Sequence, residues 1–306
     1  MRDSLARFVV NSALLVLLST TALAQQIADP HFNTRVETPA FSKNFPRVLF
    51  DEAHNNVDTT SGRYKPFADL LFNDGFHLAV NRQPFTKASL QTFKILVIVN
   101  PLGAEDADED GAAEPAFTAE ECAAVSDWIR GGGALLFVAD QTPFAAAAEV
   151  LAQKLGIDLG KGQTTDPQNA DEELADASVI VYSRANHLLA DHLIMNGRSE
   201  AERVNRVVVF TGQSLKGPEG SELLFKVSDT AVDKLAPPGK DVSAKGRAQG
   251  LALRLGKGRV VALGDAAMLS AQLTGSDNKP FGMNIPGSDN RQLALNIMHW
   301  LAGLLK

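Results

Sequence analysis

Short, almost wholly apolar runs recur along the first half of the chain: RVLF at 47–50, ILVIV at 95–99 and ALLFVA at 134–139. Runs of this length, rich in leucine and β-branched residues, are typical of strands that are covered on both faces. Segments with helical spacing separate them, at 64–73, 118–130 and 143–156. The alternation predicts an α/β fold with a doubly wound, mostly parallel sheet.

Local signals mark the ends of two of these helices. Thr118 and Glu121 have the spacing of a capping box, and Gly131 follows the last turn of the same helix. Pro143 suits the first position of the next helix, with Thr142 as its cap.

The second half of the chain is less regular. Residues 160–176 form a polar excursion without periodicity. Further strands are expected at VIVY (179–182), VVVF (207–210) and LLFKV (223–227). GLALRL and RVVALG, joined by Gly256-Lys257-Gly258, predict a β-hairpin, and a last helix starts near Asp289. We therefore predict one α/β domain over 46–306, preceded by an extended lead at 25–45.

The N-terminus has the pattern of a secretory signal peptide. Arg2 and Arg7 flank a short n-region, and the apolar stretch that follows, Phe8 to Leu18, is too short to span a bilayer. Ala22-Leu23-Ala24 supplies the small-x-small cleavage site. We expect cleavage after Ala24, no membrane span in the processed chain and a periplasmic or secreted location. The net charge of −7, without a block of Lys or Arg, argues against nucleic acid as a partner.

Polar side chains follow several of the expected strands. Ligands bind outside the carboxyl ends of the strands in open parallel sheets, near the point where the strand order reverses. FDEAHNN at 50–56 follows the first strand, and Asn100, Asp140, Thr211 and Asp265 follow later ones. The first-rank candidates for a ligand site are Asp51, Glu52, His54, Asn55, Arg63, Asp140, Gln141 and Asp265, and the second-rank candidates are Ser270, Gln272, Asn284 and Asn290.

The FDEAHNN run allows more than one interpretation. A carboxylate directly after a buried strand is partly desolvated and needs a partner, and Arg63 is the expected partner of Asp51. Alternatively, Asn55 and Asn56 make a turn in an ordinary polar loop. Asp, Glu and His also bind metals, but D-E-x-H is not a recognised zinc spacing and H-E-x-x-H is absent, so neither a metal nor a cofactor is predicted.

Nucleophilic catalysis has no support in the sequence. Neither G-x-S-x-G nor G-x-C-x-G occurs, and Asp140-Gln141 stands where a nucleophile elbow would carry Ser or Cys. Cys122, the single cysteine, lies on a helical pattern and is expected to be a small buried hydrophobe. No P-loop or dinucleotide-binding motif is present.

Five segments between 46 and 304 are distinctive together: VLFDEAHNN, TSGRYKPFADLLFNDGF, DWIRGGGALLFVAD, GKGRVVALGDAAMLSAQ and GMNIPGSDNRQLALNIMHWL. They resemble the bacterial domain-of-unknown-function 4350 family. That family is related to class I glutamine amidotransferase-like proteins, and to auxiliary domains of gliding-motility ABC transporters and of intraflagellar transport proteins. The resemblance implies a flavodoxin-like sheet without a catalytic cysteine, and it implies no reaction.

Three functions stay open on the sequence. The leading one is an exported, non-catalytic, amidotransferase-like domain that binds a polar small molecule, a glycan or an envelope protein. The alternative is a hydrolase of an envelope glycan or peptide, with Asp51 or Glu52 as general base and His54 as acid or metal ligand. The third is an adaptor subunit of a membrane complex that docks through Phe144 and the alanines at 145–148.

Overall fold

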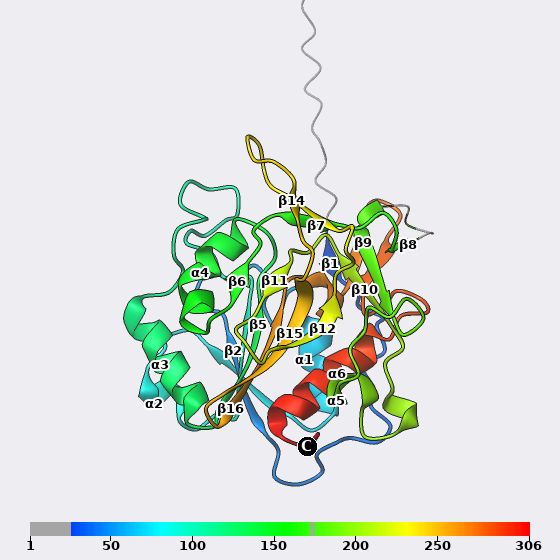
Figure 1. Ribbon diagram of the computed structural model, residues 1–306. Coiled ribbons are helices and arrows are strands. Elements are labelled where there is room, and N and C mark those ends of the chain that lie inside the picture. Colours follow the sequence, from blue (N-terminus) through cyan, green and yellow to red (C-terminus); the bar gives the residue numbers. More distant parts are fainter. Residues whose placement is uncertain (1–25, 172–173, 175) are drawn as a thin grey trace, which may run out of the picture.

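The structure is a computed structural model that describes residues 26–171, 174 and 176–306 (Figure 1). The expected signal peptide, residues 1–24, lies outside the described residues, as does Gln25 at the start of the lead. Four β-sheets and the helices around them make up the described part.

Nine strands form the main sheet, which is parallel in one half and antiparallel in the other. The parallel half contains, in spatial order, β3 (His77–Asn81), β2 (Arg47–Asp51), β4 (Ile95–Val99), β5 (Ala134–Val138) and β16 (Gly258–Leu263). The antiparallel half continues with β15 (Ala248–Leu255), β11 (Leu215–Lys216) and β6 (Asp158–Leu159), and β12 (Glu222–Lys226) also pairs with β15. The predicted α/β fold and the β15–β16 hairpin are therefore present, but the sheet is mixed and not mostly parallel.

The order of the parallel strands reverses between β2 and β4. The chain runs from β2 outward to β3 and then crosses back past β2 to β4, β5 and β16. In sheets of this kind the loops that leave the two central strands diverge at the carboxyl edge, and ligands bind there.

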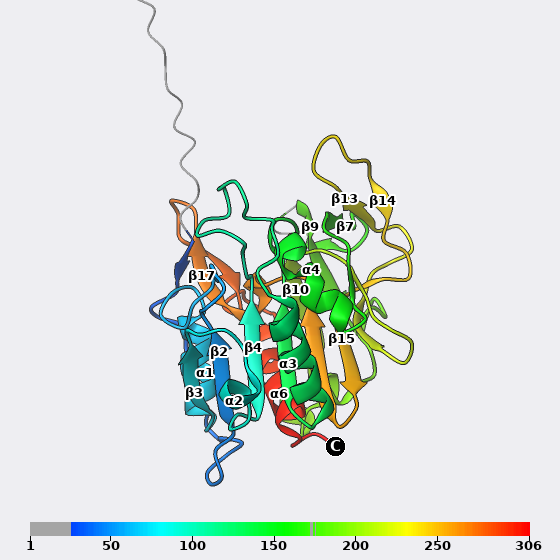
Figure 2. The ribbon, with the colours of Figure 1, turned by 90° about the vertical axis from the view of Figure 1, so that its left-hand side faces the viewer.

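Helices cover both faces of the sheet (Figure 2). α2 (Lys87–Leu90), α3 (Ala119–Arg130) and α4 (Phe144–Lys154) share one core with Leu96 and Leu135. α1 (Lys65–Asn73), α5 (Leu193–Asn196) and α6 (Asn290–Ala302) share the other with Val97 and Leu136. The strand runs are apolar throughout because alternate residues of each strand enter opposite cores. None of the helices in the described part is long and apolar enough to cross a membrane.

The helix boundaries follow the local sequence signals with one exception. α3 begins after Thr118, and the predicted capping box with Glu121 is confirmed, with both reciprocal hydrogen bonds present. α6 begins after Asp289, as predicted. Thr142 does not cap α4, because Pro143 already has helical backbone angles and separates Thr142 from the first turn.

The alanine run of α4 faces the protein interior. Ala145, Ala147 and Ala148 are fully buried, and two of them belong to the core shared with α3. Small side chains allow a helix to approach a sheet closely, which explains the run. The run 145–148 was a candidate docking face, with a tightly packed helix as the more usual interpretation of such a run, and the burial of these alanines supports the packed helix.

The VIVY and VVVF strands do not join the main sheet. They lie in β9 (Asp176–Ser183) and β10 (Arg206–Phe210), which pair antiparallel with each other, and β9 also pairs with β8 (Ala170–Asp171). Val207 and Val209 enter the core that contains α6, whereas Val208 and Phe210 pack in a smaller cluster. A strand of a small sheet that is covered on both faces has the apolar pattern of a central strand, so the sequence could not distinguish the two.

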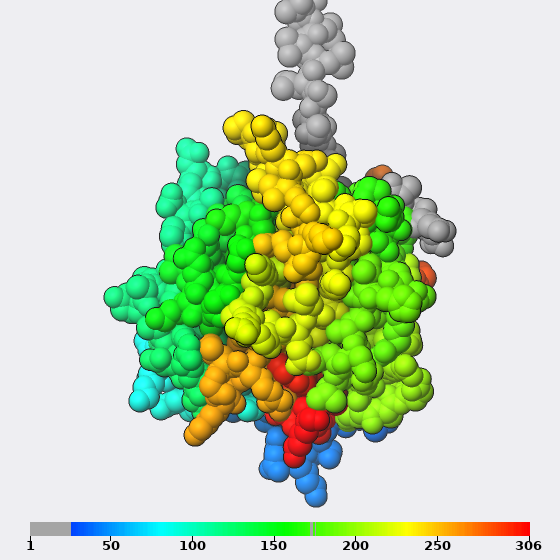
Figure 3. Space-filling model, in the orientation of Figure 1, coloured from blue at the N-terminus to red at the C-terminus, as the bar shows by residue number. Residues whose placement is uncertain are grey.

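Two further sheets have three short strands each. β1 (Ile27–Ala28), β17 (Ala271–Thr274) and β18 (Lys279–Gly282) form one, which joins the lead to the C-terminal segments, next to the 3-10 helix η2 (Ala267–Leu269). β7 (Gln163–Thr165), β13 (Val232–Lys234) and β14 (Val242–Ser243) form the other, so part of the polar excursion at 160–176 is strand. The segment around β14, yellow in Figure 3, projects from one end of the molecule. A second 3-10 helix, η1 (Glu200–Glu202), precedes β10.

Candidate functional site

The polar side chains that follow β2 form a buried network. His54 Nδ1 lies 2.8 Å from Asp51 Oδ2, and His54 Nε2 lies 2.9 Å from Glu121 Oε1 on α3. Asn81 Nδ2, at the end of β3, donates to Asp51 (3.0 Å), and the Phe85 amide donates to Glu121 (2.9 Å). Both ring nitrogens of His54 and both carboxylates therefore have partners inside the protein.

The surroundings of His54 favour its protonated form. The ring packs between Phe85 and Phe117, with centroid distances of 4.8 and 4.6 Å. Burial alone would lower the pKa of His54, but the hydrogen bonds and charges of Asp51 and Glu121 together outweigh it and raise the pKa above its ordinary value. An imidazolium that donates to two carboxylates cross-links the β2 loop to α3. The network offers no free general base, so it does not support the hydrolase interpretation.

The next residues of the run hold the loop that follows β2. Glu52 Oε1 accepts hydrogen bonds from the amide and the hydroxyl of Thr60, at 2.8 and 2.7 Å. Glu52 Oε2 lies 3.4 Å from the Arg82 guanidinium. Asn55 has a φ of 49°, a left-handed conformation that Asn tolerates in turns.

This loop then crosses toward β4. Asn56 Nδ2 donates to the Val99 carbonyl (2.9 Å) and holds the crossing in place. The expected pairing of Arg63 with Asp51 is wrong, because Asp51 bonds to His54 and Asn81, whereas the charge of Arg63 acts on Asp58. The loop therefore contributes to two separate clusters, the buried histidine network and a cavity.

The cavity lies beside the carboxyl ends of β4, β5 and β16 and has a volume of 170 Å³; we call it the carboxyl-end cavity. Its lining residues are Gln26, Asp58, Arg63, Asn100, Asp140, Phe144, Phe210, Thr211, Asp265, Ala266, Ala267, Gln272 and Phe281. Four sequence candidates are among them: Arg63, Asp140, Asp265 and Gln272. Eight are not: Asp51, Glu52, His54, Asn55, Gln141, Ser270, Asn284 and Asn290. The cavity is smaller than pockets for drug-sized ligands, which suits a small molecule.

Asn100 joins two of the carboxyl groups that surround this cavity. Its Nδ2 donates to Asp58 Oδ2 and to Asp140 Oδ2, both at 2.9 Å, and its Oδ1 accepts from the Asp140 amide. The second oxygen of Asp140 accepts from the Ala266 amide (2.9 Å). The residues at the ends of β4, β5 and β16 are thus linked to one another.

Asp265 is the third carboxyl group and is 1% exposed. It accepts three backbone hydrogen bonds, from Phe210 (2.9 Å), Ala267 (3.0 Å) and Met268 (3.1 Å). Burial, and then the charge of Asp140, raise the pKa of Asp265 well above its ordinary range.

Burial raises the pKa of the other two carboxyls as well. The pKa of Asp140 rises to about 7, although the hydrogen bonds from Asn100 and Ala266 oppose the shift. The pKa of Asp58 is also raised by burial, against the attraction of Arg63. Asp140 therefore exchanges its proton near neutral pH, which is typical of functional sites.

Several polar groups of the lining residues lack a hydrogen-bond partner in the described part of the chain, and Arg63 and Gln272 carry two of them. The Arg63 guanidinium makes no hydrogen bond or ion pair there, although the charges of Asp58 and Asp140 act on it from a longer distance. Gln272 is 3% exposed, and its buried Oε1 has no partner. The Arg63 guanidinium is therefore a donor that a ligand in the cavity can satisfy, whereas Gln272 Oε1 is buried away from water.

The backbone is strained at two positions of the cavity wall. Asn100 has a φ of 43° and Thr211 a φ of 56°, which a β-branched residue rarely adopts. Gln213 holds the turn after Thr211 in place, since its Nε2 donates to the carbonyls of Ala139 (2.7 Å) and Asp140 (2.9 Å). Such strain concentrates at functional sites.

The other second-rank candidates hold the C-terminal segments together. The Ser270 hydroxyl donates to a carbonyl of η2 (3.0 Å), and Asn284 Nδ2 donates to the Gln272 carbonyl (2.9 Å). Asn290 exchanges two hydrogen bonds with the backbone of Val208 in β10. These side chains have structural roles.

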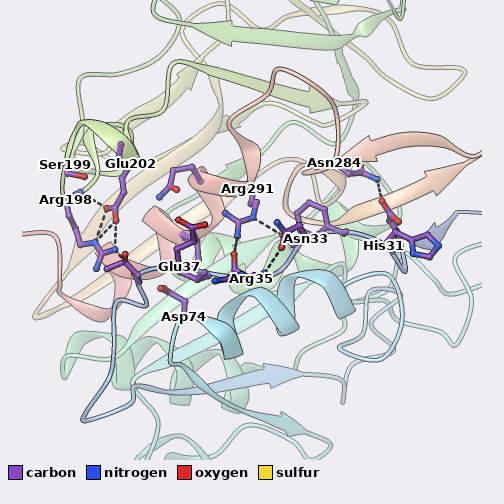
Figure 4. A pocket seen from close by; sticks show the side chains of 17 residues that line it. His31, Asn33, Arg35, Glu37, Asp74, Arg198, Ser199, Glu202, Asn284 and Arg291 are labelled. Carbon is purple, nitrogen blue, oxygen red and sulfur yellow. Dashed lines mark hydrogen bonds and ion pairs between the residues drawn. The ribbon is translucent and has the colours of Figure 1, made fainter.

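A larger groove of 1060 Å³ lies between the N-terminal lead and α6 (Figure 4). Arg291 donates to the carbonyls of Asn33 (3.1 Å) and Arg35 (2.6 Å), and Arg198 forms an ion pair with Glu202. The Arg291 hydrogen bonds attach the lead to the body of the protein. The lead therefore forms one wall of the groove.

Sequence reasoning missed residues whose partners come from other elements. Glu121 was explained fully by its capping box, although its second oxygen binds His54. Asp58 lay in a polar loop without any signal of burial, yet it is 3% exposed.

Cys122 is buried, and burial raises the pKa of its thiol to about 11, in agreement with the predicted buried hydrophobe. Among the described residues, no group of three or more His, Cys, Asp or Glu could hold a metal ion.

Comparison with known proteins establishes a likeness in fold. No protein-family model matches the chain, and no curated protein matches it. The solved N-terminal domain of mmIFT52 is similar with a TM-score of 0.60 and 15% identity, over 83% of this chain and 97% of that chain. Cytoplasmic protein STM1381 from Salmonella typhimurium LT2 has a TM-score of 0.47 and 13% identity, over 86% of this chain and 100% of that chain. A ThuA-like protein from Bacteroides uniformis ATCC 8492 has a TM-score of 0.42 and 14% identity, over 90% and 95%.

Proposed function

We propose that this protein is an exported, non-catalytic α/β domain that binds a small polar ligand in the carboxyl-end cavity. The observation that carries the proposal is the Arg63 guanidinium, which lines the cavity beside the strand-order reversal and has no hydrogen-bond or ion-pair partner among the described residues. Asp140 stands where an elbow nucleophile would stand, and its oxygens already accept hydrogen bonds from Asn100 and Ala266. The cavity is therefore better suited to binding than to covalent catalysis.

We further propose that the chain belongs to the domain-of-unknown-function 4350 family and has the doubly wound, flavodoxin-like core of class I glutamine amidotransferase-like proteins. The spatial order β3, β2, β4, β5, β16 and the five distinctive sequence segments support this assignment. Export rests on the N-terminal sequence pattern. Expression of the full chain in a bacterium is expected to yield periplasmic or secreted protein that begins at Gln25, whereas unprocessed cytoplasmic protein would contradict export.

Amide NMR spectra test whether the cavity binds small polar molecules. The probes are inorganic phosphate, acetate, glycolate, glycine and glycerol at millimolar concentration. At least one is expected to shift the amide signals of Thr211, Ala266 and Ala267 in the wild-type protein and to lose this effect in Arg63→Met. Arg35→Met is the matched control, since Arg35 is an exposed arginine outside the cavity. No shift with any probe would reject the binding function.

A further inference from the structure

The start of the N-terminal lead forms part of the wall of the carboxyl-end cavity. Gln26 lines the cavity, and β1 follows it directly. β1 pairs antiparallel with β17, where Ala28 lies opposite Gln272, a second lining residue. A segment from the beginning of the chain therefore lies against a site that is otherwise built from the ends of the sheet strands and from the C-terminal segments.

Few interactions hold this segment in place. β1 has two residues and lies at the edge of a three-stranded sheet. The Asp29 amide donates to the Ala271 carbonyl (2.8 Å), and Asp29 Oδ2 accepts a hydrogen bond from Asn284 Nδ2 (3.0 Å). The side chain of Ile27 is 42% exposed, so β1 buries little apolar surface. A segment with a short strand pairing and few buried contacts opens locally at a low cost in free energy.

The lead is attached more firmly a few residues later. Phe32 and Phe41 pack against the core that contains α1 and α6. Arg291 of α6 donates to the carbonyls of Asn33 and Arg35. Release of residues 26–29 from β17 therefore leaves the rest of the lead on the body of the protein.

The body of the protein holds the opposite walls of the cavity. Asn100 bonds to both Asp58 and Asp140, and Asp265 accepts three backbone hydrogen bonds. Gln213 bonds to the backbone at the end of β5. Displacement of these walls would break buried hydrogen bonds between strands of the main sheet, whereas displacement of residues 26–29 breaks the β1–β17 pairing and the Asp29 hydrogen bonds.

We propose that residues 26–29 form a strap that closes one side of the carboxyl-end cavity and is released from β17 to admit the ligand. This inference rests on the proposed function, since it concerns access to the same site. Return of the strap after binding separates the ligand from water. Hydrogen bonds between the ligand and Arg63 are electrostatically stronger in the resulting environment of low dielectric constant.

Amide hydrogen exchange tests the release of the strap. The protection factor of the Asp29 amide is expected to be about a hundredfold lower than that of the Val208 amide, which is buried and donates to Asn290. Equal protection of the two amides would overturn the release.

A reversible disulfide gives a second measurement of the release. Ala28 and Gln272 lie directly opposite each other, so the double variant Ala28→Cys, Gln272→Cys is expected to form a disulfide across β1 and β17. Cys122 is buried and does not compete. The oxidised variant is expected to protect the Asp29 amide about tenfold more than the same variant after reduction, and equal protection would contradict release at β1.

The titration of Asp140 tests whether the strap closes the cavity. The amide of Ile27 faces β17, because it lies two residues before the bonded amide of Asp29, so Ile27→Pro removes a donor from the pairing. In a ¹³C NMR titration this variant is expected to move the midpoint of Asp140 from about 7 toward 3.8 by more than about one pH unit, as water enters. Val242→Pro is the matched control, since Val242 is an exposed valine in β14, a two-residue strand outside the cavity, and it is expected to leave the midpoint unchanged.

The outcomes separate the strap from the proposed function. An unchanged Asp140 midpoint in Ile27→Pro, or a wild-type midpoint near 4, would overturn closure of the cavity by the strap. These measurements need no ligand, so their failure leaves the binding function in place. Binding of none of the NMR probes rejects the function itself.

Discussion

Two aspartates at the carboxyl edge have different surroundings. Asp51, at the end of β2, is paired with His54, which is paired in turn with Glu121. Asp140, at the end of β5, receives hydrogen bonds from neutral amides only, and burial raises its pKa to about 7. A carboxylate with a cationic partner stabilises the fold, whereas one without such a partner stays responsive to pH and to ligands.

Replacement of His54 by alanine is expected to lower the free energy of unfolding by about 3 kcal/mol, because Asp51 and Glu121 lose their shared partner inside the protein. Urea unfolding at pH 6 measures the loss. His31→Ala is the control, since His31 is exposed and its ring has no partner among the described residues, and it is expected to change the free energy by less than about 0.5 kcal/mol. Equal losses in the two variants would contradict the role of the network.

The cost of His54→Ala is also expected to depend on pH. The pKa of His54 is raised, so its contribution is complete below the unfolded value of 6.5 and is lost as pH rises through the folded pKa. Burial would raise the pKa of Glu121, but its hydrogen bonds from Thr118, His54 and Phe85 lower it, so its contribution holds above 4.5 and is lost in acid. The cost is therefore expected to be larger at pH 5.5 than at pH 8.5, and the opposite order would contradict the charged network.

The carboxyl group of Asp140 is expected to titrate near pH 7 in a ¹³C NMR experiment. Because its pKa is raised on folding, stability falls as pH rises from its unfolded value of 3.8 to about 7, by up to about 1.4 kcal/mol per pH unit for one proton. Asp140→Asn is expected to make this fall smaller, since the raised pKa values of Asp58 and Asp265 still contribute to it, and urea unfolding between pH 4 and 8 measures the difference. A midpoint near 4 would contradict the raised pKa of Asp140.

α2 and α3, on the same face of the sheet, both begin with a capping box. Only the box of α3 contains a side chain that also bonds to residues outside its helix. Thr86 caps the short, exposed start of α2 with Ser89. Thr118 caps α3 with Glu121, whose other oxygen binds His54 and the Phe85 amide. The α3 cap therefore also positions one end of the buried histidine network.

Thr118→Ala is expected to cost about 2 kcal/mol of stability, and Thr86→Ala about 0.5–1 kcal/mol. The difference arises because loss of the Thr118 hydroxyl removes both a cap and a hydrogen bond that orients Glu121 (2.9 Å). Urea unfolding of the two variants gives the comparison directly. Similar costs would mean that the cap and the network are energetically independent.

At the scale of the whole molecule, one sheet separates two cores. α1, α5 and α6 close one core, and α2, α3 and α4 close the other, and every central strand contributes to both. Each of the two tryptophans lies at a different core. Trp300 on α6 is buried in the first core, and Trp128 on α3 packs against the second, so their fluorescence monitors the two cores separately.

Both tryptophans are expected to report the same unfolding midpoint, because neither core survives loss of the shared strands. Trp128→Phe and Trp300→Phe each leave one tryptophan, whose fluorescence is followed during urea unfolding. Normalised curves that follow the far-UV circular dichroism of the same variant indicate a single cooperative unit. Fluorescence midpoints that depart from the circular dichroism midpoint would show that the faces unfold separately.

The amino-acid sequence predicted those elements whose signals are local. The runs at β2, β4 and β5, the α3 capping box, the β15–β16 hairpin and α6 were all predicted, because periodicity, caps and turns act over a few residues. It also placed Asp140 and Asp265 among its twelve site candidates because they follow strands. Arg63 was a candidate as the expected partner of Asp51, and Gln272 as a polar residue in an otherwise apolar segment.

Which of these side chains lie in contact became visible in the folded protein and could not be predicted from the sequence. In the sequence, the polar residues after β2 and those after β5 and β16 had the same pattern of polar side chains at a strand end. In the fold, Glu121 of α3 pairs with His54, whereas the charge of Arg63 acts on Asp58. The sequence likewise did not show which sheet VIVY and VVVF join, because strands that are covered on both faces have the same apolar pattern in any sheet. Burial and pairing depend on residues distant in the chain, so the unpaired groups that mark the cavity became visible only in the fold.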